Sequence, residues 1–540
     1  MGAGCLAAPS GQSLAMAGGD AQLKCVTWNI AAINNNPFEY YLTLPGEDTK
    51  AYGDLMLAVQ KLIDAPGSRD VPVSEVFVPE MWARLKRAMA EQGWSGLDQV
   101  EERWLNDFSK RKIIEGFLKD KDLGSKRLAS MPDRFTNTIN NSDGSVVCRP
   151  AIINNYQGDV SDLKSWFDQW FQFMFVSEVS VKNRKGELES KKVCSLLQKI
   201  TTAKYPAVTE DEEAISLPLQ TLCLAIFDAI LIHILNTAAS SAETGAINWH
   251  DMKVKICAAL VVDKQSNTIN ILAGQPTYLN ADVIFLQEVA GAFIERLEKH
   301  PQLGDRFVVL VPQAADHVRD QNSIILVAKA RLGEAGGVPE ECILGGGFAR
   351  ADVADGDICA FSVPLRFGKT TKRVLLASFH GDTAGLASTP VVNAVRKHAA
   401  DSDLRAVMGL DANTHALEDP AGKTKFVGSF LKDLEDGPEP VKHSWEGKPS
   451  DWITTCNARS YLQPQLNKAV KYEERLVSKS TDRNPKDYIL FSASAFEVSS
   501  PAKKDNTGGC FFEEGIDLPT LTFPSDHAIV ASSLRLRASP

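Results

Sequence analysis

The ten cysteines of this 540-residue chain include no CxxC pair, so a structural zinc site has no support in the sequence. Several of the cysteines lie inside apolar runs, where a reduced thiol acts as a small hydrophobe. The N-terminus has no hydrophobic region of the kind found in a signal peptide. These absences predict a reducing intracellular compartment, and we expect a cytoplasmic location.

Positive charge is also scarce. The 68 acidic and 58 basic residues give a formal net charge of −10, which opposes tight non-specific binding to duplex nucleic acid. A phosphate-bearing substrate stays compatible with this charge, because a local metal site can dominate the field that the substrate meets. The most apolar stretch, 217–235, contains Gln220, Asp228 and His233. Because a membrane span tolerates these groups poorly, we predict a buried helix and no integral membrane segment.

Three kinds of sequence follow one another along the chain. Residues 1–21 are small and rich in Gly and Ala, and we expect them to be disordered. Residues 31–280 have mostly helical periodicity, with a loop-like section at 131–158. From residue 281 onward, short β-branched runs alternate with helical segments, which is typical of an α/β core with two packed sheets. We infer that a first strand at 22–30 completes this core and that 31–280 is an insertion.

Four apolar segments, far apart in the chain, each end in polar side chains that suit a metal site. The segments 23–29, 281–288, 407–413 and 523–527 end in Asn29, Glu288, Asp411 with Asn413, and Asp526 with His527. If the strands lie side by side, these ends converge on one rim, where unmatched carboxylates repel one another. A hard divalent cation such as Mg²⁺ or Mn²⁺ removes that conflict, because it takes oxygen ligands. The pattern therefore indicates a metal-dependent phosphoesterase.

In their order along the chain, these segments resemble the endonuclease/exonuclease/phosphatase superfamily, whose members share the DNase I-like fold. The resemblance covers residues 22–30 and 281–537. It implies a four-layer α/β/β/α sandwich of two packed, mainly antiparallel sheets, here with an inserted helical subdomain. One departure concerns the family's Gly-Asp-x-Asn pattern: Leu410 precedes the Asp, and the glycine lies one place earlier, at Gly409.

The resemblance implies a set of metal-binding residues for Mg²⁺ or Mn²⁺. Glu288 would be a ligand, Asn29 would position it and touch the ion, and Asp526 would ligate or approach the ion. A Glu at this place is also a common first-turn helix carboxylate, and an Asn after a strand is commonly a turn former. The order of the motifs favours the metal-binding roles.

The resemblance also implies catalytic roles. Asp411 would orient or deprotonate the attacking water, and Asn413 would hold this water and the developing charge. His527 would contact the phosphoryl oxygen or the water, with Asp487 orienting it through its other ring nitrogen. His380 would contact the phosphate. The simpler alternatives are an Asx turn at 411–413 and a purely structural histidine at 380.

Substrate selection is the part that the sequence determines least. The insertion leaves the core directly after Asn29, so it either caps the catalytic mouth or forms a peripheral bundle. Arg127, Arg134 and Arg149 flank the loop-like section of the insertion, and Arg459 precedes Asp487. We select Arg134, Arg149 and Arg459 as candidates for clamping a second phosphate, since guanidinium pairs bidentately with phosphate. The alternative for each is an ordinary surface arginine.

The sequence thus predicts a divalent-metal-dependent phosphodiesterase or related phosphoesterase that acts by in-line attack of an activated water. RNA, DNA or a nucleotide is the preferred substrate. The Trp-Cys-Asp-Arg motif of inositol 5-phosphatases is missing, and residues 484–488 read NPKDY instead. Two alternatives stay open: a lipid or inositol phosphoesterase, and a catalytically silent scaffold that binds a protein partner through the helical insertion.

Overall fold

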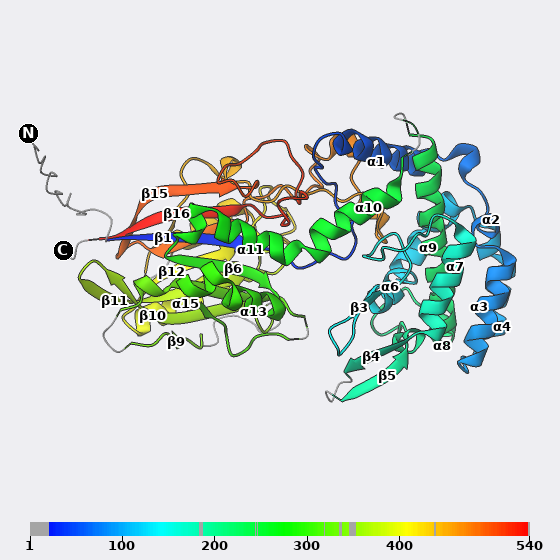
Figure 1. The fold of residues 1–540 in the computed structure, drawn as a ribbon, viewed down its shortest axis with the longest axis horizontal. Coiled ribbons are helices and arrows are strands. Elements are labelled where there is room, and N and C mark those ends of the chain that lie inside the picture. The colour runs from blue at the N-terminus through cyan, green and yellow to red at the C-terminus, as the bar shows by residue number, and fades with distance from the viewer. Residues whose placement is uncertain are drawn as a thin grey trace, which may run out of the picture.

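The computed structural model describes residues 21–537 except 183–186, 243, 244, 246, 318, 334–336, 345–352, 437 and 438. Two six-stranded sheets form one half of the molecule, on the left of Figure 1. In spatial order, the first sheet contains β15 (Phe496–Asp505), β16 (Ile529–Leu536), β1 (Gln22–Asn29), β6 (Val283–Val289), β8 (Asn322–Ala328) and β7 (Phe307–Leu310). The second contains β13 (Val441–His443), β14 (Asp487–Ser492), β12 (Arg405–Asp411), β11 (Thr370–His380), β10 (Ile358–Phe367) and β9 (Glu340–Glu341).

Helices cover the outer face of each sheet. The first sheet packs against α11 (Lys264–Gly274), α12 (Pro276–Leu279), α13 (Gly291–Lys299) and α14 (Pro301–Arg306). The second packs against α15 (Ser388–Asp401) and α16 (Val427–Glu435). Neighbouring strands are antiparallel except β1 with β6 and β11 with β12, which are parallel. The predicted fold class, a four-layer sandwich of mainly antiparallel sheets, is confirmed.

The space between the two sheets explains the shifted glycine of the Asp-x-Asn motif. Phe285 of β6 points into this space and is fully buried there with Val363 and Val407 of the second sheet. At Gly409 of β12, a Cβ atom would lie 2.4 Å from the Phe285 side chain. Real Cβ atoms do not approach other heavy atoms so closely, so close packing of the sheets requires glycine at this position.

Between β1 and β6 the chain forms a helical block, on the right of Figure 1. Two hairpins, β2 (Thr138–Asn140) with β3 (Val146–Cys148) and β4 (Glu178–Lys182) with β5 (Leu188–Lys192), extend from it. The section 131–158, predicted as loop, therefore holds most of one helix and the first hairpin. The helices of the block are α1 (Asp48–Asp64), α2 (Val73–Val76), α3 (Pro79–Glu91), α4 (Leu97–Asn106), α5 (Lys121–Ser125), α6 (Ser130–Thr136), α7 (Leu163–Phe171), α8 (Glu210–Ala214), α9 (Ser216–Ser240) and α10 (Trp249–Cys257).

The helical block has its own hydrophobic core around α9. By length and composition α9 could cross a membrane, but 83% of its most apolar stretch is buried inside the protein. Its neighbours in this core include Trp104 of α4 and Trp166 of α7, both almost completely buried. A helix that is apolar all round is expected at the centre of a large core, and α9 spans the buried helix predicted at 217–235.

Packing ties the helical block to the sandwich. The helices α11 and α12 lie within 31–280 in sequence, yet Leu272 and Tyr278 pack with the outer face of the first sheet. Conversely, Ala458, Leu462 and Val470, from the segment between β13 and β14, belong to the core of the block. The sequence border at 280 therefore does not coincide with the border between the two cores.

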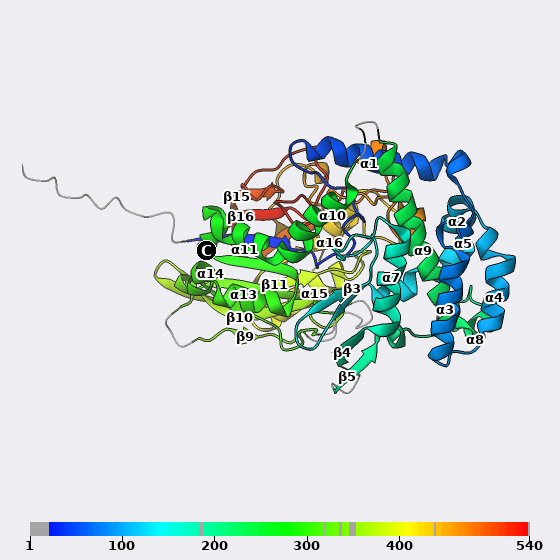
Figure 2. The same cartoon turned by 45° about the vertical axis from the view of Figure 1, so that its right-hand side comes forward.

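The helical block lies at the end of the sandwich toward which β1 runs (Figure 1), and it keeps this place in the turned view (Figure 2). Asn29 stands at that end of β1, so the edge with the predicted site residues faces the block. The predicted disorder at 1–21 concerns residues that lie, apart from residue 21, outside the described part of the chain.

Candidate active site

Asn29 joins the two sheets at the predicted site. It is fully buried at the end of β1. Its Nδ2 donates to Oε1 of Glu288 at 3.1 Å and to Oδ2 of Asp411 at 3.0 Å, while its Oδ1 accepts from the backbone N–H of Ala31 at 2.8 Å. One amide nitrogen therefore holds a carboxylate from each sheet, and the two carboxylates are close enough to face a common ion.

Glu288 lies at an irregularity of β6. The register against β8 shifts around this residue, and its φ is 57°, a left-handed conformation that is uncommon for a non-glycine residue. Its Oε2 accepts from the backbone N–H of Ala32 at 2.8 Å. Burial opposes the charge of Glu288, but His380 and the hydrogen bonds from Ala32 and Asn29 outweigh burial and hold its pKa well below the ordinary range. Backbone strain of this kind is frequent at functional sites.

Asp411 ends β12 and begins the turn that carries Asn413. The backbone N–H of Asn413 donates to Oδ1 of Asp411 at 2.9 Å, and its Nδ2 donates to the carbonyl oxygen of Gly381 at 2.9 Å. Asp411 and Asn413 are 1% and 6% exposed, and Asn413 also has a positive φ, 48°. The segment 411–413 is thus an Asx turn, which is the simpler alternative that the sequence left open. The same turn directs Oδ2 of Asp411 toward Asn29 and the site.

Two histidines face these carboxylates. His527 Nδ1 lies 3.0 Å from Oδ2 of Asp487, and His527 Nε2 lies 3.7 Å from Oδ2 of Asp411. His380 Nε2 lies 3.2 Å from Oε1 of Glu288 and 3.8 Å from Oδ2 of Asp411. Burial lowers the pKa of each imidazole, but the neighbouring carboxylates outweigh burial, raising the pKa of His527 to about 10 and that of His380 above its ordinary value. His527, held by Asp487, therefore presents Nε2 as a hydrogen-bond donor.

Asp526 lies beside this group of residues, where its Oδ2 accepts from Nδ2 of Asn457 at 3.0 Å. A buried lysine that the sequence did not single out, Lys264 of α11, lies close by. Its Nζ donates to the carbonyl oxygens of Ala32 at 3.3 Å and Pro524 at 2.7 Å, which ties the loop after β1 to the loop before β16. Burial lowers the pKa of Lys264 to about 8, against the opposing effect of nearby carboxylates.

A second buried lysine, Lys486, directly precedes Asp487. Its Nζ lies 2.7 Å from Oδ2 of Asp482. Burial lowers the pKa of Lys486, but Asp482 and Asp411 outweigh burial and raise it above the ordinary value. Its place next to a strand-end carboxylate was a usable sequence signal, whereas Lys264 lies within a stretch assigned to the insertion and has no such signal.

The prediction that Arg149 binds substrate is wrong. Arg149 is fully buried inside the helical block, where its Nε donates to Oδ2 of Asp228 at 2.7 Å and its Nη2 to Oδ1 of Asp133 at 2.7 Å. Trp170 Nε1 donates to the same Asp228 oxygen at 2.9 Å. A guanidinium without solvent contact cannot meet a phosphate from solution, so this arginine holds the block together.

The other two predicted arginines, Arg134 and Arg459, line one hollow of about 560 Å³ between the helical block and the sandwich. Arg134 belongs to α6 and is exposed, and Arg459 forms an ion pair with Glu39. The Arg459 side chain is 33% exposed, so both arginines are accessible from solution, as a substrate contact requires.

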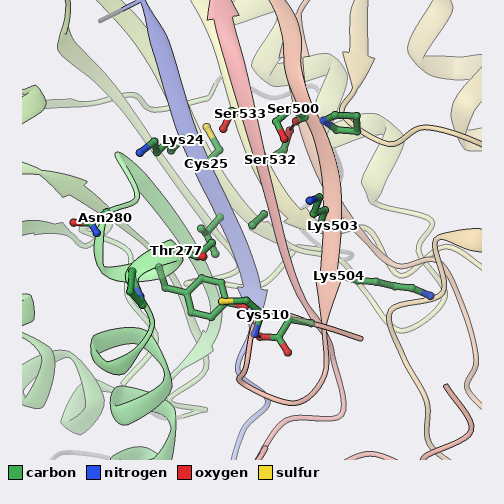
Figure 3. A pocket seen from close by; sticks show the side chains of 16 residues that line it. Lys24, Cys25, Thr277, Asn280, Ser500, Lys503, Lys504, Cys510, Ser532 and Ser533 are labelled. Atoms are coloured by element: carbon green, nitrogen blue, oxygen red, sulfur yellow. Dashed lines mark hydrogen bonds between the residues drawn. The ribbon is translucent and has the colours of Figure 1, made fainter. Parts of the chain in front are cut away.

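A different hollow, of about 380 Å³, lies on the outer face of the first sheet (Figure 3). Lys24, Thr277, Ser500 and Ser533 are among its lining residues, from β1, α12, β15 and β16. The side chain of Lys504 extends away from this hollow, and its Nζ lies 3.7 Å from the centre of the Phe512 ring. Its lining includes none of the predicted catalytic or metal-binding residues, so we do not assign catalysis to it.

Comparison with known proteins gives a family match in the helical block alone. The family model described as a domain of unknown function, DUF8234, matches residues 70–254. No curated protein matches the chain. Solved structures with similar folds include D. rerio TDP2 humanized by 14 mutations, the human Nocturnin catalytic domain with bound sulfate, and an endonuclease/exonuclease/phosphatase from Bacteroides vulgatus.

These three structures are 15%, 14% and 12% identical to the chain, with TM-scores of 0.32, 0.32 and 0.33. The matches cover 51%, 55% and 51% of this chain and 95%, 91% and 90% of those chains. Similarity at this level transfers no activity. The architecture observed directly is a sandwich of two packed mixed sheets with polar strand ends, interrupted after its first strand by a helical block.

Proposed function

We propose that the protein is a divalent-metal-dependent phosphoesterase that hydrolyses a phosphodiester of a nucleic acid or nucleotide. The observation that carries this proposal is the junction at Asn29, where Glu288 and Asp411 converge on one amide nitrogen beside His380. Carboxylates gathered in a buried place repel a phosphate ester by themselves, but they suit one when they hold a divalent cation, with the His380 imidazole as a donor beside it.

The donor set fits a hard divalent cation such as Mg²⁺ or Mn²⁺. Glu288 and Asp411, which both accept from Nδ2 of Asn29, offer carboxylate oxygens, with Asp526 nearby. A second grouping shares Asp411 with them: ligand atoms of Asp411, Asp487 and His527 all lie within 4.8 Å of one another. No cysteine is among these donors, so the set is dominated by oxygen, as Mg²⁺ and Mn²⁺ prefer. We assign Glu288 as the principal ligand, with Asn29 holding it in place. A bound ion would supply charge neutralisation at the phosphate and lower the pKa of a coordinated water.

The protein's own residues have separable roles in in-line attack. Oδ2 of Asp411 orients the attacking water and accepts its proton, while the amide of Asn413 fixes the turn and faces the same place. Nε2 of His527 donates to a phosphoryl oxygen as negative charge grows there, and Asp487 keeps the ring in that orientation. His380, between Glu288 and Asp411, donates to a second phosphoryl oxygen.

The alternatives make different demands on these residues. A silent scaffold has no need for the complete set Asn29, Glu288, Asp411, Asp487 and His527 in mutual contact, so this contact favours an enzyme. A lipid or inositol phosphoesterase would use the same chemistry on another leaving group, and a substrate panel separates it from a nuclease.

The test is hydrolysis of RNA, DNA, dinucleotide, lipid and inositol phosphates by wild type and Glu288→Gln, with Mg²⁺ or Mn²⁺. We expect nucleic-acid or nucleotide hydrolysis, reduced in the variant by about 10²- to 10³-fold, the range seen when one stabilising group is removed from a transition state. Glu295→Gln, an exposed Glu of α13, is the matched control and should retain wild-type activity. Wild-type turnover of Glu288→Gln would contradict the metal assignment, and no turnover of any substrate would favour the scaffold.

A further inference from the structure

The hollow that contains Arg134 and Arg459 has walls from both halves of the molecule. The loop after β1 contributes Asn34 and Asn36, the helical block contributes Arg134 and Asn137, and the segment before β14 contributes Arg459. Its volume of about 560 Å³ lies within the range of small-molecule binding sites, and amide groups and guanidinium groups line much of it.

Two chain segments connect this hollow directly to the candidate active site. The backbone N–H of Ala32 donates to Glu288, and the next residue, Ile33, lines the hollow. On the other wall, Asn457 donates to Asp526, and Arg459 follows two residues later. The hollow is therefore bordered by the same two short segments that contact Glu288 and Asp526, so it is the neighbouring place for the rest of a substrate whose reacting phosphate lies there.

Among the described residues that line this hollow, the charged groups are paired except for Arg134. Among the residues that the structure describes, none forms an ion pair with the exposed guanidinium of Arg134. The acidic groups nearby are already engaged: Glu39 pairs with Arg459 and accepts from Asn34 at 3.0 Å, and Asp133 accepts from the buried Arg149. The guanidinium of Arg134 is therefore the lining cation that a ligand anion could pair with, because the carboxylates beside it already have partners.

A further cation, Lys468, stands close to both Arg459 and Arg127. Burial lowers the pKa of Lys468, and the charges of Arg459 and Arg127 lower it further. Positive charges that a fold brings together repel one another, and a bound anion relieves that repulsion. The guanidinium of Arg459 also lies 5.1 Å from the centre of the Tyr40 ring, which fixes its orientation at the border of the hollow.

We propose that this hollow binds a second phosphate group of the substrate, with Arg134 of the helical block as its principal contact and Arg459 as its neighbour. The inference rests on the proposed function and deepens it, because it makes the preferred substrate one with at least two phosphates. It also gives the helical block a role: the block completes the substrate site from outside the sandwich. A guanidinium can donate two parallel hydrogen bonds to one phosphate, which an amide or ammonium group cannot reproduce in the same geometry.

The test compares two substrates of the same chemistry. A dinucleoside monophosphate has one phosphate, and the corresponding trinucleoside diphosphate has two. We expect wild type to prefer the trinucleotide, and Arg134→Gln to reduce this preference in kcat/KM by about 10- to 100-fold, chiefly through KM, as expected for the loss of a charge-assisted hydrogen-bond pair. The control is Arg87→Gln, which changes an exposed arginine of α3 and should keep the wild-type preference. Helix α3 lies on the side of the helical block away from the sandwich (Figure 1).

The outcomes separate this inference from the proposed function. If wild type hydrolyses the substrates but Arg134→Gln has the wild-type preference, the second phosphate site is refuted and the phosphoesterase stands. If wild type hydrolyses neither, the proposed function fails, and the site is then tested by fluorescence anisotropy with a labelled trinucleotide and with an inositol bisphosphate in EDTA. Binding of either probe that weakens in Arg134→Gln supports the site and identifies the source of the phosphate. Absent binding, or equal binding by wild type and variant, overturns it.

Discussion

Replacement of Arg149 by Met should destabilise the helical block without any direct effect on substrate. Arg149 and Asp228 are both 0% exposed, and the guanidinium donates to Asp228 at 2.7 and 3.2 Å and to Asp133 at 2.7 Å. In the variant, Asp228 stays buried with Trp170 as its remaining donor. Removal of one partner from a buried ion pair typically costs about 3–5 kcal/mol, because the other charge is left uncompensated.

Urea unfolding followed by tryptophan fluorescence measures this loss, since Trp170 lies in the network. With a urea dependence of about 1–3 kcal/mol per molar, the transition of the block should move by about 1–5 M. The double variant Arg149→Met/Asp228→Met should lose less stability than the single one, because no unpaired charge remains at Asp228. Arg134→Met is the exposed control and should change stability by about 0.5 kcal/mol at most. If Arg149→Met had wild-type stability but weaker substrate binding, the structural role of Arg149 would be refuted, and the substrate contact predicted from the sequence would be supported.

Three further predictions concern the sandwich. Asp487→Asn should lower kcat by about 10²-fold or more, since His527 loses the carboxylate that orients it; steady-state kinetics with unchanged kcat would contradict this. Burial opposes the charge of Asp482, but Lys486 outweighs burial and lowers its pKa to about 2, so this pair stabilises the fold above about pH 4 and the contribution is lost as the pH falls toward 2. Asp482→Asn should therefore have a flatter decline of unfolding free energy over that range than wild type, and an identical decline would disprove the pairing effect. Lys264→Met should lower both kcat and melting temperature, because two loop carbonyls lose their shared donor; equal values by kinetics and calorimetry would exclude this positioning role.

The convergence of the strand ends was predictable because it depends on local pattern. Each apolar run is one strand long, and parallel pairing of β1 with β6 and of β11 with β12 places their carboxyl ends at one edge. This pairing places Asn29 near Glu288 in the first sheet and His380 beside Asp411 in the second, and packing of the two sheets brings the two pairs together. The order of the motifs along the chain indicates the four-layer sandwich without knowledge of any tertiary contact.

The remaining features depend on tertiary packing, which leaves no local signal. Lys264 approaches the site because α11 packs on the first sheet, although its sequence neighbours are helical and belong to the stretch assigned to the insertion. The sequence wrongly predicts a substrate contact for Arg149, because an arginine beside a loop-like section resembles a surface residue. Its ion-pair partner Asp228 lies 79 residues away on α9, so no local pattern indicates the pair. Gly409 illustrates the same limit: its close approach to Phe285 belongs to the packing of two sheets, not to the motif.

The most direct test of the central claim is calorimetric titration of Mn²⁺ into wild type, Glu288→Gln and the control Glu295→Gln. The claim is that strand ends from distant parts of the chain hold one divalent cation. We predict saturable binding at the active site in wild type and the control, and a loss of that binding event in Glu288→Gln. Equal binding of Mn²⁺ by wild type and Glu288→Gln would contradict the claim.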